Sequence, residues 1–183
     1  MKIIETELPG VMLIEPAVFR DARGFFMETW SQARYQQAGL PTAFVQDNVS
    51  YSVCGVLRGL HLQHPNRQGK LVYVLQGEVY DVAVDVRRDS PTFGRWFGHT
   101  LSSENKLQLY IPPGFAHGFC VTSDAALFVY KCSDFYNAQA EMAIRWNDPD
   151  IGIDWPIRSP SLSDRDAAAP LLREIPLDRL PTK

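Results

Sequence analysis

The sequence has no surplus of positive charge. Its 183 residues include 18 Lys and Arg against 21 Asp and Glu, which gives a formal net charge of −3. A protein that binds nucleic acid through bulk electrostatics needs a basic surplus to neutralise phosphates. We therefore expect no nucleic-acid partner, although a local cationic pocket for a small anion stays possible.

Long hydrophobic runs are also missing. No apolar stretch approaches the roughly 20 residues that a membrane-spanning helix needs. The N-terminal MKIIETELPG carries Lys2, Glu5 and Glu7 and so lacks the apolar centre of a signal peptide. We expect neither a membrane partner nor secretion.

Cysteine is scarce, and its number is odd. Cys54, Cys120 and Cys132 are far apart and stand among apolar neighbours. Such spacing is untypical of a disulfide framework or a zinc knuckle. We expect three reduced core residues and a cytoplasmic location.

Helical periodicity is nearly absent, and strand periodicity replaces it. One short helix is predicted over 32–38, with Ser31 as its cap and Gly39 and Pro41 at its end. Alternating or apolar segments rich in β-branched and aromatic residues predict strands at 71–75, 78–86, 106–111 and 126–132.

Many short strands separated by turns predict a mainly β fold, a sandwich or a jelly-roll barrel. The length suits one domain over residues 1–183. Prolines multiply from about residue 150, so we expect an irregular tail with one short helix that wraps over the barrel.

Histidine spacing argues against a metal site. The segment IPPGFAHGF at 111–119 contains the pattern Pro-x-Gly-x-x-His, which ends at His117. This pattern resembles the second motif of the cupin superfamily of jelly-roll barrels. Metal cupins carry two histidines at positions i and i+2, which face the same side of a strand. Here His61 and His64 are three apart, Gln63 stands in the middle position, and no acid follows before Glu78. We predict no metal, and we expect His64 to be a solvated loop residue.

Several blocks in a fixed order closely resemble the dTDP-4-dehydrorhamnose 3,5-epimerase family, a cupin-type jelly roll. They cover nearly the whole chain: FRDARGFFMETW (19–30), FVQDNVSYS (44–52), VLRGLHLQ (56–63), QGKLV (68–72), GEVYDVAVDVR (77–87), SPTFG (90–94), LSSENK (101–106), IPPGFAHGF (111–119), VYK (129–131) and WNDPDIGIDWP (146–156).

The resemblance implies an isomerase of dTDP-L-rhamnose biosynthesis. The family inverts carbons 3 and 5 of a 4-keto-6-deoxy hexose on a nucleoside diphosphate, and it needs no cofactor. Both carbons flank the ketone, so their protons are acidified by delocalisation into an enolate. Such a reaction calls for a base, an acid on the opposite face, a stabiliser of the enolate and a grip on the nucleotide.

The resemblance assigns the base to His61 and its orienting partner to Asp166. An imidazole is suited to taking a proton near neutral pH. The plainer interpretation of His61 is a hydrogen-bonded core histidine. Ser163 and Asp166 also fit a helix capping box, and Asp164 is a second candidate partner.

Lys70 matches the family's enolate stabiliser, and Tyr130 matches the acid. A phenol is protonated at neutral pH and can return a proton from the face opposite His61. Tyr130 alternates with Phe128 and Cys132, which predicts that it faces inward while Lys131 faces outward. The alternatives are a solvated lysine at a strand start and a buried core tyrosine.

The family places both Arg58 and His61 at the substrate, but three residues along a regular strand put them on opposite faces. We predict an irregularity at Gly59–Leu60 that restores one face. Without it, Arg58 would be a structural residue.

The resemblance also implies a set of substrate contacts and a homodimer in which N-terminal residues reach the partner's nucleotide. Arg58 and Arg165 are cations suited to a diphosphate, and Arg165 stands where the family commonly has lysine. At Tyr136 a core role is equally open. The full set of predicted binding residues is Phe19, Arg23, Glu28, Gln46, Asn48, Arg58, His117, Phe119, Tyr136 and Arg165.

Other functions remain as alternatives. The runner-up is an epimerase that inverts a single carbon of a related dTDP-4-keto-6-deoxy sugar. A non-enzymatic sugar-nucleotide-binding cupin would be expected to lack at least one of His61, Lys70 and Tyr130, and all three are present. A metal-dependent isomerase or dioxygenase would need the missing ligands.

Overall fold

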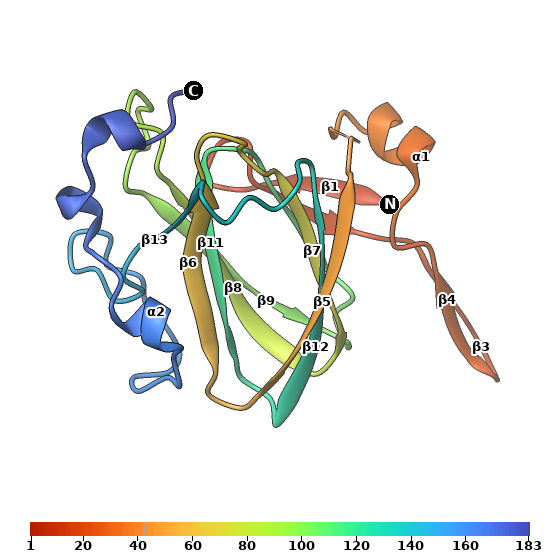
Figure 1. Ribbon diagram of the computed structural model, residues 1–183. Coiled ribbons are helices and arrows are strands. Elements are labelled where there is room, and N and C mark those ends of the chain that lie inside the picture. Colours follow the sequence, from red (N-terminus) through yellow and green to blue (C-terminus); the bar gives the residue numbers. More distant parts are fainter. Residues whose placement is uncertain (42) are drawn as a thin grey trace.

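Two antiparallel sheets face each other and form the body of the protein (Figure 1). The computed structural model describes residues 1–41 and 43–183. The first sheet has six strands in the order β1 (Lys2–Glu5), β2 (Met12–Glu15), β10 (Gln108–Ile111), β7 (Lys70–Gln76), β12 (Ala125–Cys132) and β5 (Gln46–Val53).

The second sheet has five strands in the order β13 (Glu141–Ala143), β6 (Leu57–Gln63), β11 (Phe115–Val121), β8 (Glu78–Asp85) and β9 (Trp96–Ser102). The predicted mainly β class is confirmed. The four predicted strands correspond to β7, β8, β10 and β12, with ends that differ by at most two residues.

The five-stranded sheet is buried on both faces. On β8, Val79 and Ala83 point into the core between the sheets, while Val82 and Val84 join a second apolar cluster on the outer face. Both rows of this strand are therefore apolar, which explains why its sequence reads as a nearly continuous hydrophobic run.

The chain after β13 supplies the cover for that outer face. Ile144, Ile151, Trp155, Leu172 and Leu180 pack into the outer cluster. The segment contains only short helices, namely α2 (Asp164–Ala167), η1 (Leu172–Glu174) and η2 (Leu177–Arg179), where one short helix was expected. In Figure 1 this blue segment runs alongside β6, which brings α2 next to the strand that carries His61.

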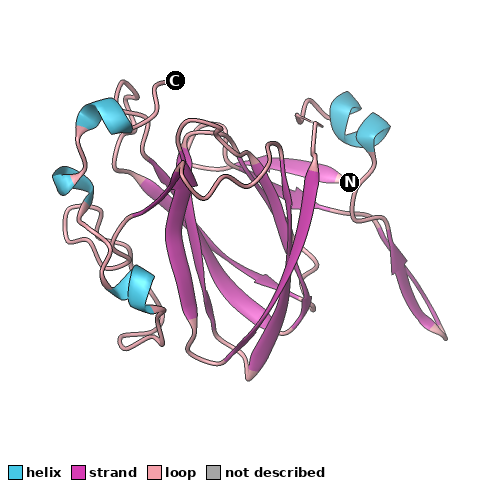
Figure 2. Cartoon of the chain, viewed as in Figure 1, coloured by secondary structure: helices cyan, strands magenta, loops and turns pink. Residues whose placement is uncertain are grey.

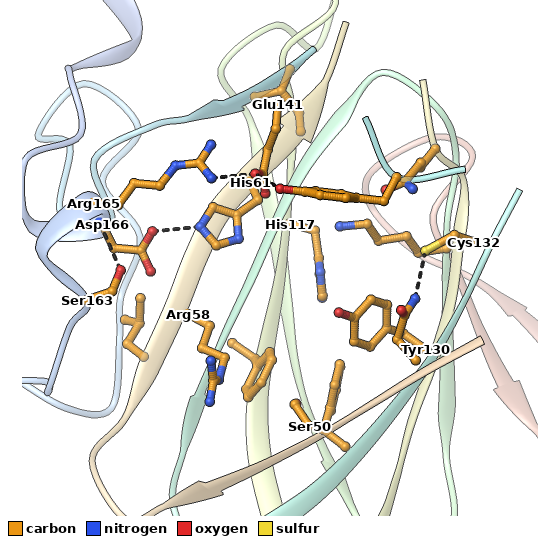
Figure 3. A pocket seen from close by; sticks show the side chains of 18 of the residues that line it. Ser50, Arg58, His61, His117, Tyr130, Cys132, Glu141, Ser163, Arg165 and Asp166 are labelled. Atoms are coloured by element: carbon orange, nitrogen blue, oxygen red, sulfur yellow. Dashed lines mark hydrogen bonds and ion pairs between the residues drawn. The ribbon is translucent and has the colours of Figure 1, made fainter. Parts of the chain in front are cut away.

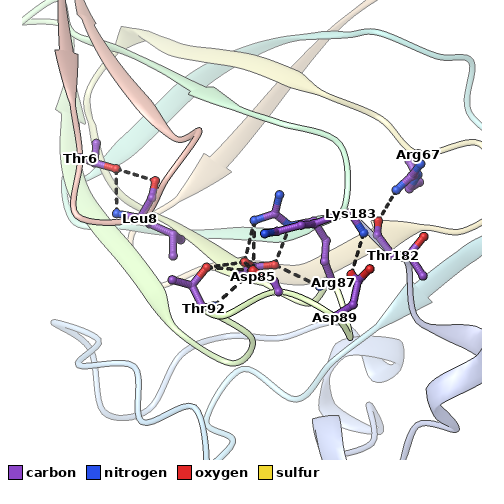
Figure 4. Close-up of polar contacts among 10 residues, drawn as sticks. Thr6, Leu8, Arg67, Asp85, Arg87, Asp89, Thr92, Thr182 and Lys183 are labelled. Carbon is purple, nitrogen blue, oxygen red and sulfur yellow. Dashed lines mark hydrogen bonds and ion pairs between the residues drawn. The ribbon is translucent and has the colours of Figure 1, made fainter.

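Polar contacts fasten the end of this segment near the β8–β9 turn (Figure 4). The backbone N–H of Lys183 donates to Asp89 at 2.8 Å, and Arg67 donates to the carbonyl of Thr182. Within the same turn, the buried Asp85 accepts from Arg87 at 2.7 and 2.8 Å and from the hydroxyls of Ser90 and Thr92 at 2.6 Å. The turn and the C-terminus are thus held together by charge-assisted hydrogen bonds.

A hairpin and a short helix extend from the six-stranded side. The hairpin, β3 (Val18–Asp21) and β4 (Gly24–Met27), projects away from the body, and α1 (Gln32–Gln37) follows it (Figure 2). The predicted helix is confirmed. It ends at Gln37, with Ala38 as its C-cap, and Gly39 follows with a φ of +81°. Ser31 occupies the cap position, but its hydroxyl makes no capping bond within the described chain, so that part of the prediction was wrong.

Two further expectations need correction. Cys54 is exposed at the end of β5, because it begins the turn into β6, whereas Cys120 and Cys132 are buried as predicted. His64 lies in the bend after β6, as predicted, but it is only partly exposed, and this partial burial lowers the pKa of its imidazole. In the part of the chain that the structure describes, no helix has the length and apolar character needed to span a membrane. The expected cytoplasmic location stays a prediction.

The predicted irregularity in β6 is confirmed. The pairing of β6 with β11 changes register between the pairs His117–His61 and Phe119–Arg58, and the Gly59–Leu60 peptide bond at this point is cis. Leu60 is fully buried in the outer cluster, whereas Arg58 and His61 both line the same interior cavity. The register shift therefore resolves the conflict that regular strand geometry posed.

Replacing Gly59 by alanine is expected to destabilise the fold at this point. Gly59 has a φ of +122°, and an added Cβ would lie 2.6 Å from Gly118 Cα and 2.8 Å from the carbonyl oxygen of His117. Backbone strain alone costs about 1–2 kcal/mol, and the clash adds to it. Urea unfolding should show a loss in free energy of unfolding of more than about 2 kcal/mol.

Gly94→Ala is the matched control for this change. Gly94 also has a positive φ, +77°, but nothing lies within 4 Å of its added Cβ. It should lose only the strain contribution. Equal losses in the two variants would contradict the close approach of β6 and β11 as the constraint.

Candidate active site

A cavity of about 680 Å³ lies between the two sheets. A volume of this size suits a small-molecule ligand with several polar groups. Eleven of the fourteen predicted site residues line it: Gln46, Asn48, Arg58, His61, Lys70, His117, Phe119, Tyr130, Tyr136, Arg165 and Asp166.

His61 enters the cavity from β6 and is held by Asp166. Its Nε2 lies 2.6 Å from Oδ1 of Asp166, as Figure 3 shows. Asp166 accepts at this nitrogen, which leaves Nδ1 as the position that can take a proton from a ligand. The side chain of His61 is 29% exposed and that of Asp166 only 4%, so the imidazole meets the cavity while the carboxylate stays behind it.

The turn that carries Asp166 is fixed by two further hydrogen bonds. Ser163 Oγ accepts from the backbone N–H of Asp166 at 3.1 Å, and the N–H of Gly59 donates to the Asp166 carboxylate at 3.3 Å. Burial raises the pKa of Asp166, but the hydrogen bonds from His61, Gly59 and Ser163 outweigh it and hold the pKa below the ordinary value. Asp166 thus makes the predicted contact with His61. Ser163 caps its helical turn, but the Asp166 carboxylate accepts from Gly59 and His61, so among the described residues only the serine half of the capping box is formed.

Tyr130 and Lys70 approach from the opposite, six-stranded sheet. Tyr130 lies on β12 with the buried Phe128 and Cys132 on its inward face, as predicted, while Lys131 points outward to Asp47. Burial raises the pKa of Tyr130, which keeps its phenol protonated at neutral pH. Lys70 lies in a poorly solvated part of the cavity, and this burial lowers the pKa of its amine.

A second histidine–aspartate pair stands on the same cavity wall as His61. His117 Nε2 lies 2.9 Å from Oδ2 of Asp81, and both residues are buried. Burial lowers the pKa of His117 despite the opposing effect of Asp81, so the imidazole stays neutral at neutral pH. Phe119 stacks on Phe128 with ring centroids 4.2 Å apart and closes the apolar side of the cavity.

Charged and aromatic side chains meet at the cavity mouth. Glu141 accepts from the guanidinium of Arg165 and from the hydroxyl of Tyr136, the latter at 2.9 Å (Figure 3). Tyr136 is more than half exposed, which excludes the core role that was open for it. Arg58 lines the cavity and donates from Nε to Ser52 Oγ at 2.9 Å and from Nη2 to the carbonyl of Tyr51 at 3.4 Å.

The inward row of β5 adds neutral polar groups. Gln46 donates to Asn48 Oδ1 at 2.9 Å, and Asn48 donates to the thiol of Cys132 at 3.6 Å. Ser50 follows on the same face, and its buried hydroxyl has no partner within the described residues. This row presents hydrogen-bonding groups to the cavity from the edge of the sheet.

The remaining three predicted residues lie on or next to the hairpin and do not line the cavity of their own chain. Phe19 is exposed on β3, Arg23 pairs with Asp21 at 2.6 Å, and Glu28 pairs with Arg34 at 3.0 Å. Their predicted contact with nucleotide is therefore possible only across an interface between two copies.

Asp81 and Glu141 were missed by the sequence analysis. An aspartate between Val79 and Ala83, in a row that faces the core, was a usable signal for a buried polar contact. Glu141 lies on a strand of three residues and offered no comparable pattern. Among residues 1–41 and 43–183, no group of three or more His, Cys, Asp or Glu side chains is arranged to hold a metal ion.

A family model described as dTDP-4-dehydrorhamnose 3,5-epimerase matches residues 5–174. The chain belongs to this epimerase family. The family and the cupin-type fold class that the sequence predicted are confirmed. A crystal structure of the Legionella pneumophila epimerase in complex with dTDP-4-keto-L-rhamnose superposes with a TM-score of 0.97 at 52% identity, covering 100% of this chain and 98% of that one.

Curated members of the family are similarly close in sequence. The Shigella flexneri dTDP-4-dehydrorhamnose 3,5-epimerase is 57% identical over 168 residues, which are 91% of this chain and 93% of that protein. The Neisseria gonorrhoeae protein of the same name is 57% identical over 169 residues, 92% of this chain, but the match covers only 52% of that protein. The chain thus spans about half the length of the latter relative.

Substituting Asp166 by asparagine is expected to make folding stability less dependent on acid pH. Because the folded pKa of Asp166 lies below that of the unfolded chain, its ionisation stabilises the native state above about pH 4. This contribution is lost as the pH falls through the folded pKa. Urea unfolding should therefore show a deficit for Asp166→Asn at pH 7 that narrows at pH 3.

The neighbouring Asp164 provides the control. It is exposed on the same turn and outside the contact with His61, so Asp164→Asn should leave the pH dependence unchanged. A deficit of Asp166→Asn that is equal at both pH values would contradict the ionic contribution.

Proposed function

We propose that this isomerase epimerises carbons 3 and 5 of dTDP-4-dehydro-6-deoxy-D-glucose to give dTDP-4-dehydro-L-rhamnose, without a cofactor. The observation that carries the proposal is the placement of His61 and Tyr130 on opposite walls of one cavity, β6 of one sheet and β12 of the other. Inversion requires that a proton leave one face of a carbon and return to the other face, and two walls can supply that.

In the proposed mechanism, Nδ1 of His61 removes the proton from a carbon next to the ketone, and the electron pair moves into the carbonyl to form an enolate. Tyr130 then donates its phenolic proton to the opposite face as the ketone re-forms. Each inversion leaves His61 protonated and Tyr130 ionised, so both must exchange protons with solvent before the next inversion. The partial exposure of both side chains supports this exchange.

Lys70 is the proposed stabiliser of the enolate oxygen. An ammonium in a poorly solvated cavity interacts more strongly with developing negative charge than one in water. The pKa of Lys70, lowered by burial, supports its placement in such surroundings. Since the reaction moves only protons and leaves the oxidation state of the substrate unchanged, it requires no redox group.

The nucleotide part is proposed to lie at the cavity mouth. Arg58 and Arg165 are planar cations that can each contact two phosphate oxygens. Gln46 and Asn48 offer hydrogen bonds from β5, and the exposed ring of Tyr136 offers a flat apolar surface. His117 and Phe119 are proposed to bound the sugar from β11.

Incubation with dTDP-4-dehydro-6-deoxy-D-glucose in deuterated water tests the proposal. We expect deuterium at carbons 3 and 5, measured by NMR of the product, because each returned proton comes from a group in exchange with solvent. Label at one carbon only would favour the single-carbon epimerase instead. Complete absence of label would contradict the enzymatic assignment.

Variants separate the proposed base from the proposed acid. His61→Ala should abolish deuterium exchange at both carbons, because no group remains to remove the proton. Tyr130→Phe should permit loss of the proton but impair inversion at least about 100-fold, the usual scale for a general acid. Full turnover by His61→Ala would overturn this division of roles.

We also propose that the active form is a homodimer. β5 is an edge strand whose outward row begins with Asp47 and is apolar and open from Val49 to Val53, with Val49 and Tyr51 63% and 62% exposed. The projecting hairpin exposes Phe19 and Phe26 as well. An apolar edge of this kind promotes association unless a partner covers it. A second copy would cover it and bring its Phe19, Arg23 and Glu28 toward the nucleotide.

Light scattering after size exclusion tests the dimer. The wild-type mass should be twice the 20.7 kDa of one chain. Val49→Asp should weaken self-association about tenfold or more, because it buries a charge at the interface. Leu177→Asp, an equally exposed change on the far segment η2, should leave the mass unchanged. A monomeric wild-type protein with full activity would contradict the proposal.

A further inference from the structure

The loop of residues 133–140, between β12 and β13, forms part of the cavity mouth and carries Tyr136. The loop is outside both sheets, so the sheet ladders do not hold its backbone. Tyr136 itself is more than half exposed and is not fixed by core packing. Some other set of contacts must determine where its ring lies.

The hydroxyl of Tyr136 donates to Glu141 at 2.9 Å, and amide side chains fix the backbone of the loop that carries the ring. Gln46 Oε1 accepts from the N–H of Tyr136 at 3.0 Å, and Gln68 Nε2 donates to the carbonyl of Asp134 at 3.0 Å. Asn66 Oδ1 accepts from the side chain of Asn137 at 3.0 Å. Together with Gln63, these residues form what we call the amide clamp: Gln46, Gln63, Asn66 and Gln68.

Gln63 is the central member of the amide clamp. Its Oε1 accepts from the N–H of Asn137 at 2.8 Å, while its Nε2 donates to the carbonyls of Asn66 at 2.8 Å and Phe135 at 3.2 Å. These contacts grip the loop on both sides of Tyr136. Gln63 is only 5% exposed, so unmade hydrogen bonds at this position would not be replaced by bulk water.

The chemistry of the contacts explains why an amide stands here. The loop presents the N–H of Asn137 and the carbonyl of Phe135 to position 63, and Asn66, between β6 and β7, presents a second carbonyl. An amide side chain offers one acceptor oxygen and two N–H donors, which matches these three groups. A carboxylate would lack the donor, and an aliphatic side chain would satisfy neither. Gln63 also stands two residues after His61 on β6, so the strand that carries the proposed base also anchors the loop.

We propose that Gln63 is a positioning residue that fixes Tyr136 at the cavity mouth and thereby sets the affinity for the nucleoside diphosphate. This inference rests on the proposed function, in which Tyr136 faces the nucleotide. Gln63 acts through the loop and has no part in proton transfer. Its loss should therefore raise KM far more than it lowers kcat.

A double-mutant cycle with dTDP as the probe tests the inference. In isothermal titration calorimetry, Gln63→Leu should weaken dTDP binding about tenfold, the effect expected when hydrogen bonds that preorganise the site are lost. In a Tyr136→Ala background the same change should weaken binding less than about twofold, because residues that act as one unit are not additive. KM should rise with the dissociation constant, while kcat stays within about twofold.

Two further variants control for general damage to the fold. Gln63→Glu keeps the acceptor for the N–H of Asn137 and loses the two donors. Its affinity for dTDP should therefore lie between those of wild type and Gln63→Leu. If Gln63→Leu does not fold, Gln63→Glu takes its place in the test. Gln139→Leu makes the matched change at an exposed glutamine of the same loop whose side chain is outside the clamp, and it should bind dTDP as wild type does.

The outcomes separate this inference from the proposed function. If both Gln63 variants bind dTDP with wild-type affinity, or if the losses in the double-mutant cycle are fully additive, the inference is overturned. The proposed function still stands in that case, provided that the wild-type protein epimerises its substrate. A wild-type protein that binds no dTDP would overturn the proposed function, and the inference with it.

Discussion

The close approach of two glycines, Gly59 on β6 and Gly118 on β11, is the constraint on which the site depends. An added Cβ on Gly59 would lie 2.6 Å from Gly118 Cα, so the strands can adopt this spacing only where a side chain is missing. The register shift at this point turns Leu60 outward and leaves Arg58 and His61 on the same inward face. A regular strand would have sent one of these two side chains away from the cavity.

The outer cover of the five-stranded sheet has a second role beyond burying apolar surface. The segment that packs Trp155 and Leu172 onto this sheet also carries α2, and α2 places Asp166 behind His61. The orientation of the imidazole therefore depends on packing at the far side of the sheet. Hydrophobic burial is non-directional, whereas hydrogen bonds are directional. Ser163 accepts from the backbone N–H of Asp166 and fixes the turn, and the N–H of Gly59 donates to the carboxylate and helps to orient it.

Strand β5 reverses the usual pattern of a sheet edge. Its inward row, which includes Asn48 and Ser50, is polar because it borders a cavity for a polar ligand. Beyond Asp47, its outward row is apolar and includes Val49 and Tyr51. Alternation alone would predict the apolar row as the inner one. The same strand thus serves ligand binding on one face and, in our proposal, subunit contact on the other.

The sequence by itself determined the ranges of β7, β8, β10 and β12, the mainly β class and the family, because alternation and turn residues act locally and the family blocks are continuous in sequence. It also located most of the cavity, including the irregularity at Gly59. Only the tertiary structure decided the partners: Asp81 for His117, Glu141 for Arg165, and the clamp around Gln63. These contacts join residues that are far apart in the chain, and the packing of the two sheets and the covering segment sets which of them meet. For the same reason Cys54 is exposed, although its neighbours in sequence are apolar.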